Sequence, residues 1–308
     1  MLILYVFQRH EFTALFVAYA VCFLAYLLAI KHTKTENDLN FYLKLAIILR
    51  GIALFAFPNL SDDIYRFIWD GHLTALGENP FSHLPRYYID NQLFTDILTP
   101  ELFSKLNSQN YFSVYPSVCQ GVFFVAVFIF PKSIYGATII IKSFLFICEI
   151  GTLFLIKKLN SNSNLITPNN SSFIIHHSSL LYGLNPLIII ELIGNVHFEA
   201  AMIFFFLLSI FILKTIKIKT KLQFKTALQF KTVLNLELNN VLKLALAALF
   251  WSLSISAKLL TIMLLSMVWR QLGWKKSIYF WLLILMTSLL LFVPIYNKYL
   301  EQYKIRWH

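Results

Sequence analysis

The residues best suited to acid–base chemistry lie in one short polar stretch, Ser61–His72, with the sequence SDDIYRFIWDGH. Asp62 and Asp63 are adjacent, and a carboxylate of this kind can take a proton from a hydroxyl nucleophile. If the stretch is helical, Asp63, Arg66 and Asp70 fall at positions i, i+3 and i+7 and form one polar stripe. The pattern therefore indicates a general base beside an apolar surface, although such a stripe is equally typical of a solvated helix face.

A second polar group stands inside an otherwise apolar run. Asn195, His197 and Glu199 follow one another at alternate positions. Polar side chains within a hydrophobic segment are costly and are usually functional. We therefore expect this trio to belong to a substrate site, with Glu149 and Glu191, which also lie in apolar stretches, as weaker candidates.

The first polar stretch needs a helix of its own to position its acids. Ser61 is a suitable N-cap, Gly77 can end the helix, and Asn79-Pro80 favours a turn. Tyr65 and Trp69 are residue types that suit the headgroup zone. We therefore expect an amphipathic helix lying on the membrane surface. Its apolar face carries Ile64, Phe67, Ile68 and Leu73.

Composition decides the class of protein. Of the 308 residues, 58% are apolar and 13% are charged, whereas a soluble domain carries about 25% charged residues. The three cysteines predict neither a disulfide framework nor a metal site. We expect an all-α integral membrane protein, a polytopic helical bundle of about eight to nine hydrophobic segments forming one domain, 1–308. The segments are Phe12–Ile30, Phe41–Pro58, Val118–Phe130, Ile134–Ile156, Phe173–Ile193, Phe198–Leu213, Val241–Ala257, Leu259–Trp269 and Ile278–Tyr296.

The distribution of charge predicts the orientation. Lysine and arginine outnumber acids by 26 to 15, a net charge of +11. Since no nucleic-acid-binding motif accompanies this excess, we attribute it to cytoplasmic loops and expect no nucleic-acid partner. Basic residues from Lys31 to Arg50 assign the first loop to the cytoplasm, and residues 214–240 form a second basic cytoplasmic loop. The long segment 59–115 is then extracytoplasmic.

One part of the topology stays open, and two stretches of low complexity carry little information about the fold. Between residues 117 and 195 the number of crossings is unsettled, because either Val118–Phe130 or the run broken by Pro186 must be split or re-entrant. Asn160–Ser172 is rich in asparagine and serine, and residues 222–233 are a tandem copy, LQFKTA then LQFKTV. We interpret both stretches as loop insertions.

The polar segment Ser61–Phe81, SDDIYRFIWDGHLTALGENPF, resembles the first-loop signature of the polytopic GT-C glycosyltransferases. The similarity is to bacterial polyprenol-phosphate-mannose-dependent alpha-mannosyltransferases and, distantly, to the catalytic subunits of GPI mannosyltransferases. Three later segments also resemble the family's motifs, and they occur in the family's order. They are YPSVCQ at Tyr115–Gln120, NPLIIIELIGNVHFE at Asn185–Glu199 and SAKL at Ser256–Leu259.

The resemblance implies transfer of a hexose, favouring mannose, from a polyprenyl-phosphate sugar to a glycan or lipid-linked acceptor. The reaction would occur at the extracytoplasmic face, in a bacterial inner membrane, and would invert the anomeric carbon. It implies that Asp62 or Asp63 is the catalytic base, with a preference for Asp62, and that neither cofactor nor metal is needed. A divalent ion could still be held loosely by Asp62, Asp63 and Asp70. Side chains expected to bind substrate are Arg66, Trp69, Asp70, His72, Tyr115, Gln120, Asn195, His197, Glu199 and Lys258.

The sequence also departs from the family's pattern. His72 and Glu78 stand where the family commonly has arginine and isoleucine, and Ser117 replaces a proline. Relatives continue beyond the position of His308, so we expect a truncated carboxy terminus. Two other functions stay open: a polytopic transporter that uses Asn195, His197 and Glu199, and a degenerate, non-catalytic relative.

Overall fold

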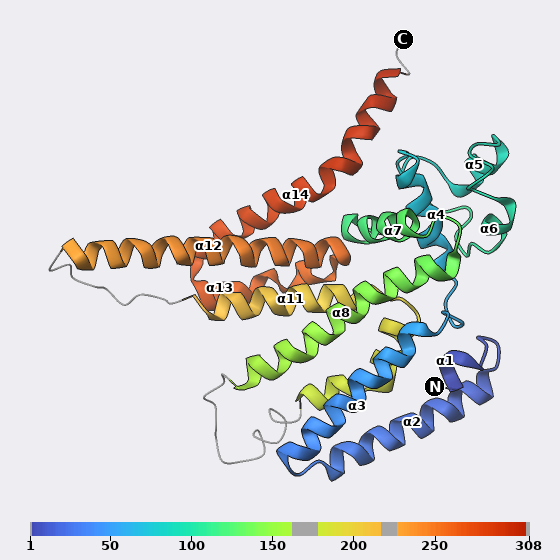
Figure 1. The fold of residues 1–308 in the computed structure, drawn as a ribbon. Coiled ribbons are helices and arrows are strands. Elements are labelled where there is room, and N and C mark those ends of the chain that lie inside the picture. Colours follow the sequence, from blue (N-terminus) through green and yellow to red (C-terminus); the bar gives the residue numbers. More distant parts are fainter. Residues whose placement is uncertain (1, 162–177, 217–226, 306–308) are drawn as a thin grey trace.

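The structure, a computed structural model, describes residues 2–161, 178–216 and 227–305, with side chains for 2–160, 178–216, 239–270 and 272–292. Within these residues every regular element is helical (Figure 1). The fold is therefore all-α, as predicted. The elements are α1 (Leu2–Tyr5), α2 (Phe12–His32), α3 (Glu36–Phe55), α4 (Asp63–Ala75), α5 (Pro85–Asp90), α6 (Pro100–Ser104), α7 (Ser117–Ile129), α8 (Ile134–Ser161), α10 (Pro186–Ile188), the π-helical turn η1 (Ile189–Gly194), α11 (Glu199–Lys214), α12 (Ala227–Ala257), the 3₁₀ segment η2 (Leu259–Met267), α13 (Val268–Leu272) and α14 (Trp274–Ile305).

Fewer helices can span a membrane than the eight to nine expected. In the described part of the chain, four are long and apolar enough: Phe12–His32, Ile134–Asn160, Asn239–Ala257 and Trp274–Phe292. A fifth span results if α10–η1 and α11, which are bent by 108° at their junction, count as one. The shortfall arises because α7 has only 13 residues, whereas a straight span needs about 20. Helix α3 is long enough but carries Glu36, Asp38, Lys44 and Arg50.

The outer helices expose more apolar side-chain surface than soluble proteins usually do. On α2, Phe12 is 76% exposed and Phe16 is 64% exposed, and on α14 Leu290 is 67% exposed. Contiguous apolar surface of this kind indicates contact with another apolar phase. Together with the four long apolar helices, it indicates a membrane protein.

Helix α8 is fastened to its neighbours by buried charges. The Arg50 guanidinium lies 2.9 Å from a carboxylate oxygen of Glu149, and both side chains are fully buried. Tyr182 donates a hydrogen bond to the other oxygen of Glu149, and Lys142 donates to the backbone carbonyls of Ala53 and Ala56 at the end of α3. Buried ionisable groups of this kind need an opposite charge, as Arg50 and Glu149 have, or hydrogen-bond acceptors, as Lys142 has. The weaker candidate Glu149 therefore serves the packing of α3 and α8.

Helix α4 forms where the polar stretch predicted it, with a small difference at its start. It begins at Asp63, so Asp62 rather than Ser61 occupies the N-cap position, and the Ser61 hydroxyl accepts a hydrogen bond from the Asp63 amide. Gly77, with φ of 82°, ends it as predicted. The amides of Gly77 and Glu78 bond back to the last turn, a glycine-dependent termination.

Helix α4 is packed inside the protein rather than exposed as a free amphipathic helix, and its position relative to a membrane stays a prediction. Its apolar face is buried, and so are two residues of its polar stripe, since Arg66 is 2% exposed and Asp70 is 0% exposed, while Asp63 stays partly exposed. One side packs on α7, while residues from α5 and α6 cover the other. Trp69, expected in the headgroup zone, is fully buried against Tyr88 and Phe103. The physical reason is that the chain after α4 folds back over the stripe and supplies it with partners.

The basic region expected to be a loop is partly helical. Residues 227–240 form the start of α12, and this includes the second copy of the tandem repeat. The first copy, apart from Ala227, and residues 162–172 of the asparagine- and serine-rich stretch lie outside the described residues.

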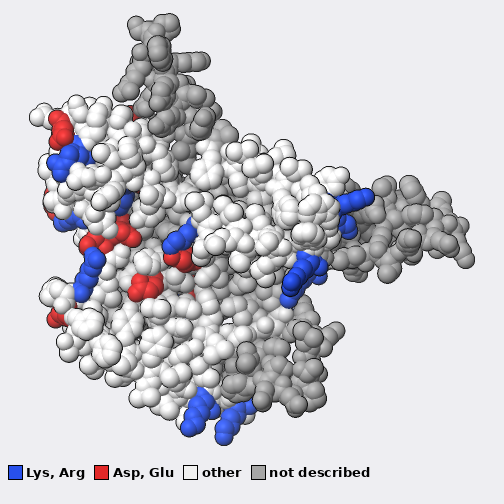
Figure 2. Space-filling view, turned by 180° about the vertical axis from the view of Figure 1, so that it is seen from behind, with Lys and Arg blue, Asp and Glu red and all other residues white. Residues whose placement is uncertain are grey.

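Charged groups are distributed unevenly over the molecule. Figure 2 shows acidic atoms on one side, mixed with basic atoms, whereas basic atoms alone lie at the bottom and on the right. In Figure 1 these two places correspond to the end where α2 meets α3, and to the end where α11 stops and α14 begins. Residues 59–115 lie toward the opposite end (Figure 1). The arrangement fits the positive-inside assignment, and the orientation in a membrane stays a prediction.

Candidate functional site

Four separate parts of the chain line one cavity of about 700 Å³. They are the first turns of α4, the segment that leads into α7, the turn between η1 and α11, and the junction of α12 with η2. The cavity thus gathers residues from each of the four sequence segments that carry the motifs. Its lining is Asp63, Phe67, Val114, Tyr115, Pro116, Cys119, Val196, His197, Phe198, Glu199, Ala257, Lys258, Leu259, Leu260 and Met263.

The two adjacent aspartates have different surroundings. Asp63 lines the cavity, and its carboxylate accepts a hydrogen bond of 2.8 Å from the Asn107 amide. Asp62 is not part of the lining, and its carboxylate lies 3.2 Å from the Arg9 guanidinium, with half of the side chain exposed. The geometry therefore favours Asp63 as the group that meets a substrate.

The basic side chains of the cavity each have an acidic neighbour. Lys258 forms an ion pair with Glu199, and the lysine side chain is still 50% exposed. His197 Nδ1 lies 3.5 Å from a carboxylate oxygen of Glu191. Glu191 also accepts hydrogen bonds from the Tyr19 hydroxyl and the Asn195 amide. Glu191 is thus in a position to orient the His197 ring.

The turn that presents His197 and Glu199 has an unusual backbone. It begins with the π-helical segment η1, continues through Val196 at φ of 58°, and leads into α11 at Glu199. A positive φ is unfavourable for a β-branched residue, and π-helical turns are frequent at functional sites. Since Val196 is fully buried, packing around it maintains this conformation and holds the turn at the cavity.

An aromatic cluster forms one wall of the cavity. The Phe67 ring stacks on Phe123 of α7 with centroids 4.4 Å apart, and it meets the edges of Tyr115 and Phe198 at 4.8 and 5.8 Å. Burial raises the pKa of the Tyr115 hydroxyl, and the nearby carboxylates of Asp63 and Asp70 add to this effect. The cluster joins α4, α7 and the η1–α11 turn. Tyr115 therefore presents a neutral phenol to the cavity.

Behind this wall, the polar stripe of α4 forms an internal network. Asp70 lies 2.8 Å from the Arg66 Nε and accepts further hydrogen bonds from Ser113 and Gln120. Arg66 also donates to the backbone carbonyls of Ser108 and Tyr111. Burial raises the pKa of Asp70, while the Arg66 charge and the hydrogen bonds oppose this rise. The network fixes residues 108–120 onto α4.

The structure thus separates the predicted site residues into two groups. Those that line the cavity are Asp63, Tyr115, His197, Glu199 and Lys258. Those outside the lining are Asp62, Arg66, Trp69, Asp70, His72, Gln120 and Asn195, of which all except Asp62 are buried in the packing of the protein.

Several residues that line the cavity were not predicted as site residues from the sequence. Phe67 and Phe198 adjoin the predicted Arg66 and His197, but apolar residues at helical spacing are typical of any core, so only their position inside the motifs could have marked them. Leu259, Leu260 and Met263 lie within five residues after Lys258 and are more than half exposed. Among the described residues, no three His, Cys, Asp or Glu side chains converge as metal ligands.

The arrangement combines two carboxylates, two basic groups and a phenol with an exposed apolar rim. Such a cavity suits an amphiphilic molecule with a polar, hydroxyl-bearing head and an apolar tail. No family model, curated protein or solved structure matches this chain.

Proposed function

We propose that the protein is a membrane glycosyltransferase, which transfers a hexosyl group from a polyprenyl-phosphate sugar to a hydroxyl of a glycan or lipid-linked acceptor. The observation that carries the proposal is the cavity shared by Asp63, His197 and Lys258, which come from distant parts of the chain. All three belong to segments that resemble motifs of the GT-C glycosyltransferases. That resemblance favours mannose as the sugar and the extracytoplasmic face of a bacterial inner membrane as the location.

In the proposed reaction, the acceptor hydroxyl oxygen attacks the anomeric carbon while the Asp63 carboxylate takes the hydroxyl proton. The new glycosidic bond forms as the bond between that carbon and the phosphate oxygen breaks. The polyprenyl phosphate then leaves with the bonding electrons, and the configuration at the anomeric carbon is inverted. Lys258 and His197 stabilise the negative charge on the departing phosphate.

The rim of the cavity supports a lipid-linked donor over a soluble one. Leu259, Leu260 and Met263 are 56%, 57% and 75% exposed and line the same cavity as the polar groups. An isoprenoid chain can lie against this surface while its phosphate stays near Lys258. A nucleotide sugar has no apolar tail to occupy that place.

The test uses membranes that contain the full chain, polyprenyl-phosphate mannose and a glycan acceptor. We expect Asp63→Asn to lower kcat by at least about 100-fold, since positioned proton transfer contributes that much or more. The matched variant Asp62→Asn should retain activity close to wild type, because Asp62 is not part of the cavity lining. Equal activity of the two variants would show that Asp63 is not the base.

A second pair of variants tests the leaving-group assignment. Lys258→Gln should lower kcat, whereas Lys243→Gln should not, because Lys243 bonds to the Thr215 carbonyl and is not part of the cavity lining. A transporter or a non-catalytic relative predicts no glycosylated product with the wild type. Absence of product across a panel of polyprenyl-phosphate hexoses and acceptors would therefore overturn the proposal.

A further inference from the structure

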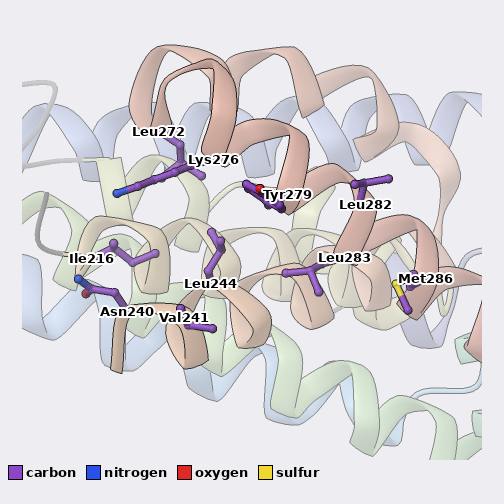
Figure 3. A pocket seen from close by; sticks show the side chains of 10 residues that line it. All are labelled: Ile216, Asn240, Val241, Leu244, Leu272, Lys276, Tyr279, Leu282, Leu283 and Met286. Atoms are coloured by element: carbon purple, nitrogen blue, oxygen red, sulfur yellow. The ribbon is translucent and has the colours of Figure 1, made fainter. Parts of the chain in front are cut away.

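A second cavity, of about 650 Å³, lies between α12 and α14 beside the end of α11 (Figure 3). It shares no lining residue with the candidate site. Its two ends differ in character: Figure 3 shows Lys276 and Asn240 at one end, Tyr279 in the middle, and Leu282 and Met286 at the other end. The cavity is therefore amphipathic along the direction of α14.

The length of this cavity matches one leaflet of a bilayer. Lys276 and Met286 are both on α14, and ten residues of α-helix rise about 15 Å. The hydrocarbon core of a membrane is about 30 Å thick, so the distance equals one half of it. A lipid chain whose headgroup lies at Lys276 would thus reach the middle of the bilayer beside Met286.

The polar end of the cavity lies in a strongly basic part of the molecule. Between residues 200 and 292 the sequence has a single acid, Glu237. Lys276 lines the cavity, Lys275 and Arg270 are close in sequence, and Lys243 binds the carbonyl of Thr215 at the end of α11. Basic residues at the membrane surface attract anionic headgroups. The charge at this end therefore selects an anionic occupant.

The cavity is open to the surroundings of the protein along its side. Val241 is 63% exposed, Tyr279 65% and Met286 61%. Because α12 and α14 both contain candidate membrane spans, an open apolar groove between them faces the acyl chains of the bilayer. We propose that this groove, named here the α12–α14 groove, binds one chain of an anionic phospholipid whose phosphate pairs with Lys276. This inference does not depend on the proposed glycosyltransferase activity.

The test measures retention of phosphatidylglycerol and phosphatidylcholine by the full-length chain, using native mass spectrometry after delipidation. We expect the wild type to bind phosphatidylglycerol more tightly than phosphatidylcholine. Lys276→Gln should weaken phosphatidylglycerol binding about five-fold, the effect of one basic residue near an anionic surface. Lys275→Gln is the matched control, because this neighbour is not part of the cavity lining, and it should have a smaller effect.

A second pair of variants tests where the chain lies. Met286→Trp places a bulky ring in the groove at an exposed position, so it should reduce binding of both phospholipids without impairing folding. Leu285→Trp, at an exposed position outside the lining, should leave binding unchanged. Equal effects of Lys275→Gln and Lys276→Gln, or of the two tryptophan variants, would overturn the proposal. So would equal binding of the two phospholipids by the wild type, the result expected if another protein segment fills the groove.

Discussion

The Nε atom of Arg66 lies 2.8 Å from a carboxylate oxygen of Asp70, and neither side chain is more than 2% exposed. The two residues are one helical turn apart on α4, so the pairing itself is local. The burial of the pair depends on residues distant in the sequence: Ser108 and Ser113, which follow α6, and Gln120 on α7. The pair therefore links the helix that carries Asp63 to the segment that carries Tyr115.

Removing one partner of this buried pair should be costly. Arg66→Met leaves the Asp70 carboxylate buried without its cation, so we expect the free energy of unfolding to fall by about 3–5 kcal/mol. The measurement is a denaturation curve of the purified protein in mixed detergent micelles. Lys105→Met is the control, because it removes the exposed Lys105–Glu101 pair and should change stability little. Similar losses in both variants would contradict the structural importance of the buried pair.

Gly71 permits the close packing of α4 on α7. A Cβ atom at this position would lie 2.6 Å from the backbone carbonyl oxygen of Phe123, which has no freedom to move aside. Gly71→Ala should therefore lower the free energy of unfolding by about 1–3 kcal/mol through overpacking. Gly121→Ala, on α7 itself, meets no atom within 4 Å and should be neutral or slightly stabilising. Thermal unfolding of the two variants decides the question, and an unchanged Tm for Gly71→Ala would refute the contact.

His72 predicts a dependence of stability on pH. Burial lowers the pKa of its imidazole below the ordinary value of 6.5, so the folded protein binds the proton more weakly than the unfolded chain. The resulting stabilisation is fully present above pH 6.5 and is lost as the pH falls through the native-state pKa. His72→Gln should flatten the curve of Tm against pH on the acidic side. His10→Gln, at an exposed position, should leave the shape of that curve unchanged; a flatter curve in this control alone would contradict the assignment.

The orientation inferred from charge can be tested with single cysteines. Asn91 and Lys34 are both exposed, and they lie in the 59–115 segment and in the first loop. We expect a membrane-impermeant thiol reagent to label Asn91→Cys in intact cells and Lys34→Cys only after permeabilisation. The parent chain is the control: Cys119 and Cys148 are buried, and any labelling of the partly exposed Cys22 is measured in it and subtracted. Labelling with the opposite sidedness would reverse the topology and move the candidate site to the cytoplasmic face.

Some of the candidate site was predictable from local patterns, and some was not. Helix α4, its termination at Gly77 and the polar character of Asp63, His197 and Glu199 follow from residue types and their spacing. The burial of Arg66 and Asp70 does not, because a polar stripe on a helix looks the same whether water or other polar groups cover it. The different surroundings of Asp62 and Asp63 could not be predicted either, since Asp62 pairs with Arg9, which is 53 residues away in the sequence.

The sequence alone predicted that this protein is helical and indicated a membrane protein, because 13% charged residues cannot cover a water-soluble globule. It also determined where the scarce polar groups stand in the chain. The tertiary structure decided which of these groups line one cavity, since Asp63 and Lys258 are brought to it by packing between distant helices rather than by their spacing in the sequence. It also decided that α4 is packed within the protein, because the segment after it returns to cover Arg66 and Asp70 of its polar stripe.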